Sequence, residues 1–383
     1  MKSICAIEGV ECAGIREGKY GLALVRAAGT AAAVFTRNRV RAACIDLMRE
    51  RIKKGFLEAL VANSGCANAF TGKRGLQDAE SMAMIAGDAM GIDPTRVAVA
   101  STGVIGRYLN LPLIERQCRF LAGRLARDGQ AEEAAAGAIM TTDLVQKHAL
   151  ARRETFAVGG ICKGSGMIAP NMGTMLAFIY TDASLRPEDL SSSLRTAAER
   201  TFNRVVVDGD TSTNDIAICT ATGHAGRVNP AEFSEALEEC CRSLAIQIAA
   251  DGEGATKLIE VRVRGATGEG VAAEIARTIV ASPLVKTAVY GEDPNWGRVM
   301  AAAGRAGHDF DPERVTLWIG EGEARVPLVE RGAILADPAR AKRAMQQNRV
   351  VFELDLGEGG GEASAWGCDL TERYVEINGR YTT

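Results

Sequence analysis

The sequence contains few aromatic residues, few histidines and no large excess of either charge, and each shortage excludes a class of function. Aromatic residues make up 5% of the 383 residues and the formal net charge is −3. We therefore expect neither the base-stacking platforms nor the basic surface of a nucleic-acid-binding protein. The three histidines and ten scattered cysteines form no C-x-x-C pattern, so we expect no metal site.

Long hydrophobic runs are also missing. The longest span about ten residues, which is too short to cross a bilayer. The N-terminal stretch MKSICAIEGVECAGIREGKYG has no sustained apolar region of the kind that a signal peptide needs. We therefore expect no membrane partner and a cytoplasmic location.

The sequence does contain enough apolar material for a large core, with 47% hydrophobic and 24% charged residues. Short apolar runs that alternate with helical periodicity predict an α/β (α+β) protein with several sheets. The predicted strands include residues 20–36, 40–48, 57–63 and 364–378, and the predicted helices include 77–90, 111–127, 187–202 and 231–251.

One stretch, KGSGMIAPNMGTMLAF at 163–178, ends a glycine-rich turn on a single threonine, Thr174, before an apolar segment. A threonine hydroxyl is a poor nucleophile unless a base lies beside it, and an N-terminal threonine carries that base as its own α-amine. Thr174 gains a free α-amine only if its hydroxyl attacks the Gly173 carbonyl and the resulting ester is hydrolysed. From these two residues alone, an ordinary junction between a loop and a strand stays open as the alternative.

The residues around Thr174 closely resemble the self-cleavage signature K-G-S-G-M-I-x-P-N-M-A-T-M-L-x-F of the ornithine acetyltransferase family, the bifunctional glutamate N-acetyltransferases of arginine biosynthesis. Other segments are similar to those of the family, in the same order and over essentially the whole chain: VANSGCANAFTG, ASTGVIG, AAAGAIMTTDLVQK, VVDGDTSTNDIAI, DGEGATK, SPLVKTAVYGEDPNWGRVMAAAGRAG and YVEINGRYTT.

The resemblance implies a layered α/β/β/α sandwich of the type found in the self-cleaving DmpA and ornithine acetyltransferase proteins, with a smaller C-terminal α/β subdomain. It also implies three segments. Residues 1–173 would be the α chain after self-cleavage, residues 174–270 would complete the layered core, and residues 271–383 would form the C-terminal subdomain.

Matched position by position, the resemblance also implies site residues. The Gly173–Thr174 bond would be the cleavage site, Thr174 the nucleophile, and Thr102 and Gly103 the oxyanion hole. The implied substrate-binding residues are Thr142, Lys163, Thr174, Glu253, Asn378 and Thr383, with Thr141 as the less favoured choice in place of Thr142.

The activity implied by the resemblance is a ping-pong transfer of acetyl from N2-acetyl-L-ornithine to L-glutamate through an acetyl-Thr174 intermediate, which yields ornithine and N-acetylglutamate. It implies no cofactor, acetyl-CoA as a co-substrate in some family members, and α and β fragments that assemble as α2β2. Two alternatives stay open. One is an N-terminal-nucleophile amidase or aminopeptidase, and the other is an uncleaved homologue that only binds its ligand.

The sequence departs from the family pattern at four places. Gly173 replaces the usual alanine, which should leave cleavage intact because glycine only relaxes the backbone. Cys66 replaces an asparagine, DLVQK (143–147) replaces D-T-x-P-K, and Gly21 stands where an aspartate is common. None of these departures changes the nucleophile.

Overall fold

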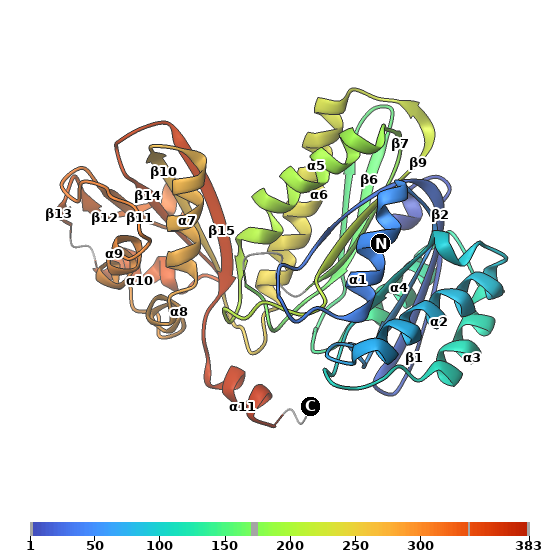
Figure 1. The fold of residues 1–383 in the computed structure, drawn as a ribbon. Coiled ribbons are helices and arrows are strands. Elements are labelled where there is room, and N and C mark those ends of the chain that lie inside the picture. The colour runs from blue at the N-terminus through green and yellow to red at the C-terminus, as the bar shows by residue number, and fades with distance from the viewer. Residues whose placement is uncertain (1–2, 170–174, 336–337, 381–383) are drawn as a thin grey trace.

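The computed structural model describes residues 3–169, 175–335 and 338–380, whose strands form two sheets with helices packed around them (Figure 1). The larger sheet has the strand order β4-β3-β2-β9-β7-β6-β5, with β1 paired to β2. The smaller sheet has the order β13-β12-β11-β14-β10-β15-β8. The prediction of an α/β protein with several sheets is therefore confirmed.

The elements that precede residue 251 form the first unit, except for the short strand β8, which belongs to the smaller sheet. The strands of the larger sheet are β1 (Glu11–Glu17), β2 (Tyr20–Phe35), β3 (Phe56–Ser64), β4 (Val97–Ser101), β5 (Lys147–Arg152), β6 (Ala157–Lys163), β7 (Leu176–Ser184) and β9 (Ile216–Arg227). The helices are α1 (Ala43–Arg51), α2 (Gly72–Met90), α3 (Leu111–Ala122), α4 (Gly129–Ile139), α5 (Pro187–Arg200) and α6 (Pro230–Ala250).

The elements of the second unit are shorter. The smaller sheet consists of β8 (Val205–Val206), β10 (Leu258–Ala266), β11 (Thr316–Ile319), β12 (Val326–Glu330), β13 (Ala333–Ile334), β14 (Arg349–Asp355) and β15 (Gly361–Cys368). The helices are α7 (Glu269–Val280), α8 (Pro283–Tyr290), α9 (Trp296–Gly304), α10 (Pro338–Met345) and α11 (Glu372–Arg380).

Strand β2 divides the larger sheet into two halves that face each other. Its first part pairs with β1 and β3, and its last part, from Thr30 to Phe35, pairs with β9. The register shifts between Arg26 and Gly29, and a bulge of this kind bends a strand and increases its twist. The two half-sheets can therefore pack face to face.

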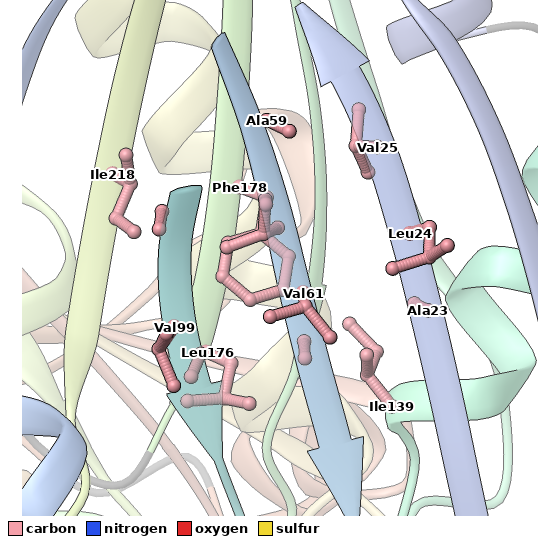
Figure 2. Close-up of a cluster of buried hydrophobic side chains, with 14 of the residues drawn as sticks. Ala23, Leu24, Val25, Ala59, Val61, Val99, Ile139, Leu176, Phe178 and Ile218 are labelled. Carbon is pink, nitrogen blue, oxygen red and sulfur yellow. The ribbon is translucent and has the colours of Figure 1, made fainter. Parts of the chain in front are cut away.

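The side chains between the half-sheets form the main core (Figure 2). Leu24, Val61 and Val99 come from β2, β3 and β4, and they share one buried cluster with Phe178 of β7 and Ile218 of β9. Figure 2 shows these side chains pointing into the space between the two layers of strands.

Strand β7 is buried on both faces, which explains its continuous apolar sequence. Leu176 and Phe178 point into the core between the half-sheets, whereas Ala177 and Ile179 point into a second core that contains α5 and α6. Helices α2 and α3 lie on the opposite side of the molecule from α5 and α6 (Figure 1). The predicted α/β/β/α layering is confirmed.

The second unit has its own core, in which α7 packs against the smaller sheet. Val261 of β10 and Ile275 of α7 belong to this same cluster. The proposed segment boundary between residues 270 and 271 falls inside α7. Among the described residues, no helix is both long enough and apolar enough to span a bilayer.

Two strand predictions were wrong. Residues 43–48 of the predicted strand 40–48 belong to helix α1, whose Cys44, Ile45 and Met48 are buried at helical spacing. A short apolar run does not distinguish a buried strand from a buried helix. Strand β15 ends at Cys368, and residues 372–380 form α11 instead of continuing it.

Candidate active site

The predicted site residues fall into a described group and an undescribed one. Gly173, Thr174 and Thr383 lie outside the described residues. Met175, which directly follows Thr174, is described and buried. The described part of the site consists of the residues that surround the start of β7.

Lys163, the last residue of β6, is a buried cation that forms no direct salt bridge with a carboxylate among the described residues, although the charge of Asp143 acts on it. It is 3% exposed, and its Nζ donates a hydrogen bond to Thr141 Oγ1 at 3.0 Å. Burial lowers the pKa of Lys163, against the opposing pull of Asp143. Lys163 pairs with Leu176 across the sheet, so it lies opposite the start of β7.

The loop that follows α4 supplies the partner of Lys163. Thr141 accepts a hydrogen bond from Lys163, whereas among the described residues no hydrogen bond joins Lys163 to Thr142, the favoured candidate from the sequence. The Thr141 N–H donates to Asp143 Oδ2 at 3.0 Å, and Asp143 Oδ1 accepts from Gly164 N–H at 2.6 Å. This geometry places Thr141 beside Lys163, and the assignment of Thr142 stays a prediction.

Asp143 belongs to a buried ion network that fixes this loop. Lys147 Nζ lies 2.8 Å from Asp143 Oδ1 and 2.5 Å from Asp251 Oδ2, and all three side chains are almost fully buried. Burial would raise the pKa of Asp143, but the positive charges of Lys163 and Lys147 outweigh it and lower the pKa to about 2.

The same network positions the next predicted residue, Glu253. The Ser165 hydroxyl donates to the Asp251 carbonyl at 2.7 Å, and Glu253 N–H donates to the Ser165 carbonyl at 3.1 Å. The segment that follows Lys163 is therefore bonded to the segment that carries Glu253.

Glu253 and Asn378 are brought together although 125 residues separate them. Asn378 Nδ2, on α11, donates to Glu253 Oε2 at 2.8 Å. Gly166 packs closely against this carboxylate: a Cβ at position 166 would lie 2.3 Å from Glu253 Cδ. A side chain at position 166 would therefore displace the Glu253 carboxylate.

Thr102 and Gly103 follow β4 and leave two donors unused. Thr102 is 5% exposed and its N–H donates to the Asn63 carbonyl at 3.0 Å. The Thr102 hydroxyl and the Gly103 N–H donate no hydrogen bond to any residue in the described part of the chain. Gly103 has a φ of +128°, and a Cβ there would lie 2.4 Å from the Gly65 carbonyl carbon. Two free donors on a fixed turn suit an oxyanion hole.

The dipeptide Asn214–Asp215, which precedes β9, joins the Thr102 turn to the start of β7. Asn214 Nδ2 donates to the Ala67 carbonyl at 2.7 Å and to the Ser101 carbonyl at 2.8 Å. Asp215 Oδ1 accepts from Met175 N–H at 2.9 Å. Burial raises the pKa of Asp215 well above its usual range.

Three buried side-chain atoms at these strand ends have no hydrogen-bond partner among the described residues, namely Asn63 Oδ1, Ser101 Oγ and Asp215 Oδ2. Buried polar atoms are normally hydrogen-bonded, so a group of exceptions requires an explanation.

The site residues that sequence reasoning missed are Asp143, Asp251 and the dipeptide Asn214–Asp215. The polar loop DGDTSTND was visible in the sequence, but its contacts depend on tertiary structure.

The relationship of the whole chain to known proteins identifies its family. The model of the ArgJ family matches residues 7–383. The chain belongs to the ArgJ family. A glutamate N-acetyltransferase from Methanosarcina mazei is 49% identical, and the match covers 99% of this chain and 98% of that protein. The arginine biosynthesis bifunctional protein ArgJ from Archaeoglobus fulgidus is 47% identical, over 99% and 100% of the two chains.

A solved structure of a family member agrees with the fold. The chain of the arginine biosynthesis bifunctional protein ArgJ from Bacillus halodurans is 41% identical and superposes with a TM-score of 0.52. The match covers 54% of this chain and 100% of that chain. The matched part of the chain thus shares its fold with an ArgJ protein.

Proposed function

We propose that this ArgJ-family protein transfers acetyl from N2-acetyl-L-ornithine to L-glutamate through an acetyl-Thr174 intermediate. The observation that carries the proposal is Lys163, a buried cation beside the start of β7 whose described partner is only a hydroxyl. Both substrates carry an α-carboxylate, and a buried charge is stable when it is paired. The name of the Methanosarcina mazei relative, a glutamate N-acetyltransferase, supports glutamate as the acceptor.

Self-cleavage between Gly173 and Thr174 is part of the same proposal. The Thr174 hydroxyl attacks the Gly173 carbonyl, and water then hydrolyses the ester to leave a free Thr174 α-amine. The solved Bacillus halodurans chain is matched in full yet covers only a little over half of this chain. Residues 174–383 are also a little over half of this chain. The length of the solved chain therefore supports cleavage of the relative at the equivalent bond.

The acetyl transfer proceeds in two steps at Thr174. In the first step the α-amine takes the hydroxyl proton, the oxygen attacks the acetyl carbonyl, and ornithine leaves with the proton. In the second step the neutral amino group of glutamate attacks the acetyl ester, and Thr174 recovers its hydroxyl. Thr102 and Gly103 donate to the negatively charged oxygen in both steps, and one such donor contributes about 100-fold or more to kcat.

Glu253 and Asn378 are proposed to bind the other end of the substrate, with Thr141 or Thr142 beside Lys163 and Thr383 closing the site. The Glu253 carboxylate suits a substrate amino group, and Asn378 holds that carboxylate in place. We propose no cofactor, and acetyl-CoA as an additional acetyl donor for glutamate.

The two fragments would stay together after cleavage because their strands alternate in the larger sheet. Strands β9 and β7 of the later fragment lie between β2 and β6 of the earlier one. Separation would break the β2–β9 and β6–β7 ladders. We propose that such pairs assemble as an α2β2 heterotetramer and act in the cytoplasm.

The choice of acyl acceptor tests the proposal against an amidase of the N-terminal-nucleophile type. Purified protein is incubated with N2-acetyl-L-ornithine, with and without L-glutamate, and ornithine and N-acetylglutamate are measured. We expect repeated turnover only with glutamate, with ornithine and N-acetylglutamate formed in equal amounts. Without glutamate, at most one ornithine should be released per active site as the acetyl ester forms. Ornithine release at the same rate without glutamate would show hydrolysis and refute the transferase assignment.

A further inference from the structure

The backbone N–H and the carbonyl of Met175 are hydrogen-bonded to two consecutive residues. Its N–H donates to Asp215 Oδ1 at 2.9 Å, and its carbonyl accepts from Ile216 N–H at 3.1 Å. Asp215 is fully buried, and the regular β7–β9 ladder begins only at Leu176, opposite Ile216. The Asp215 side chain therefore extends the ladder by one hydrogen bond toward position 174.

Asn214 makes the equivalent contact on the other side of the site. Its Nδ2 binds the Ala67 and Ser101 carbonyls, and its Oδ1 accepts from the Thr213 hydroxyl at 2.5 Å. Ser101 directly precedes Thr102. The amide of Asn214 thus holds the turn that carries the two proposed oxyanion donors.

Among the described strands, none pairs with both the Thr102 turn and the start of β7. Strand β4 lies at one edge of the larger sheet, and β3, β2 and β9 separate it from β7 in the strand order. The side chains of Asn214 and Asp215 span the two half-sheets at this end. Because the two residues are consecutive, their Cα atoms are fixed about 3.8 Å apart.

We propose that Asn214 and Asp215 are positioning residues that set the separation between the oxyanion donors at Thr102–Gly103 and the nucleophile at position 174. The inference rests on the proposed function. After cleavage, position 174 becomes a chain end, and chain ends are poorly ordered unless they are held. The Asp215 bond holds the adjacent residue, and a misplacement of about 1 Å costs about 100-fold in rate.

The test compares Asp215→Leu, Asp215→Asn and Asn214→Asp with wild-type protein. Leucine has a similar size but no acceptor, so we expect slow self-cleavage and a kcat about 100-fold lower, with KM for glutamate nearly unchanged. Asparagine keeps an acceptor oxygen for Met175 N–H, so Asp215→Asn should restore most of kcat. Asn214→Asp replaces both donated hydrogen bonds by an acceptor and should also lower kcat without changing KM.

Asp182, near the end of β7, provides a matched control, because Asp215 forms its bond at the start of β7. Its Oδ1 accepts from Ala157 N–H at 2.8 Å, the same kind of bond that Asp215 makes. Asp182→Leu should therefore lower the melting temperature as Asp215→Leu does, while self-cleavage and kcat stay at the wild-type level. Thermal unfolding of every variant separates positioning from loss of the fold.

The outcomes distinguish this inference from the proposed function. Wild-type protein without acetyl transfer would refute the proposed function itself. An active wild type together with a normal kcat in Asp215→Leu, or equal losses in Asp215→Asn and Asp215→Leu, would overturn only the positioning role. If Asp215→Leu does not fold, a wild-type kcat in Asn214→Asp would overturn it, and a lowered kcat with unchanged KM would support it.

Discussion

The most discriminating prediction concerns two buried lysines that are sixteen residues apart in the chain but differ in their partners. Lys147 lies between Asp143 and Asp251, whereas Lys163 has Thr141 as its partner among the described residues. The substitution of each by methionine keeps the length and apolar stem of the side chain and removes the charge. We expect opposite effects on stability and activity.

The magnitudes follow from these contacts. Removal of one partner of a buried ion pair costs about 3–5 kcal/mol because the other charge stays buried and unpaired, so Lys147→Met should strongly lower the free energy of unfolding. Lys163→Met removes a cation that burial destabilises, but it also removes the attraction between that cation and the Asp143 carboxylate. The free energy of unfolding should therefore change much less than in Lys147→Met. A charge-assisted hydrogen bond to a substrate carboxylate contributes about 1.5–3 kcal/mol, so kcat/KM should fall about 10- to 150-fold.

Urea unfolding and steady-state kinetics with both substrates measure the two effects. At neutral pH, we expect Lys163→Met to unfold close to the wild-type urea midpoint and to lose kcat/KM for both N2-acetyl-L-ornithine and L-glutamate. A Lys163→Met protein that retains kcat/KM for both substrates would refute the role of Lys163 in carboxylate binding. Destabilisation by Lys163→Met as large as that by Lys147→Met would refute the view that the Lys163 charge is available to pair with a substrate carboxylate.

Three further predictions concern the surroundings of Lys163 and Glu253. Gly166→Ala should raise KM for both substrates with little loss of stability, because the new Cβ displaces the flexible end of Glu253; an unchanged KM would contradict this placement. Asn378→Ala should raise KM by about 2- to 10-fold through loss of one hydrogen bond to Glu253, whereas an unchanged KM would show that α11 does not hold this carboxylate during turnover. Asp143→Asn should weaken the fall in the free energy of unfolding as the pH is lowered. The folded pKa of about 2 lies below the unfolded reference of 3.8, so the stability from Asp143 is present above about pH 4 and is lost as pH falls through about 2. Urea midpoints at pH 7, 4 and 2 measure this loss. A variant whose midpoint falls with pH as steeply as that of the wild type would contradict the prediction.

The strongly patterned parts of the fold were predictable from the sequence. Strand β2 and helices α2, α5 and α6 follow the hydrophobic periodicity closely. The errors arose where an apolar run was short, as in α1, or where an amphipathic segment followed a strand without a proline or glycine break, as in α11. The face-to-face packing depends on the bend in β2, and hydrophobic pattern alone did not predict it.

The site was predictable only as a set of separate motifs. The motif resemblance indicated Lys163, Glu253 and Asn378, but the bond between Glu253 and Asn378 depends on where α11 lies. The roles of Asp215 and Asn214 could not be derived locally, because their partners Met175 and Ser101 lie far away in the chain. A polar turn has the same sequence signal whether its side chains cap the turn or join distant strands.

The central claim is that Thr174 cleaves the chain and then carries the acetyl group. Intact-mass analysis of purified protein after incubation with N2-acetyl-L-ornithine alone tests this most directly. We predict two fragments, 1–173 and 174–383, with one acetyl group on Thr174 in the second fragment, and a single unmodified chain for Thr174→Ala. A wild-type chain that stays uncleaved while it transfers acetyl, or an acetyl group on fragment 1–173, would contradict the claim.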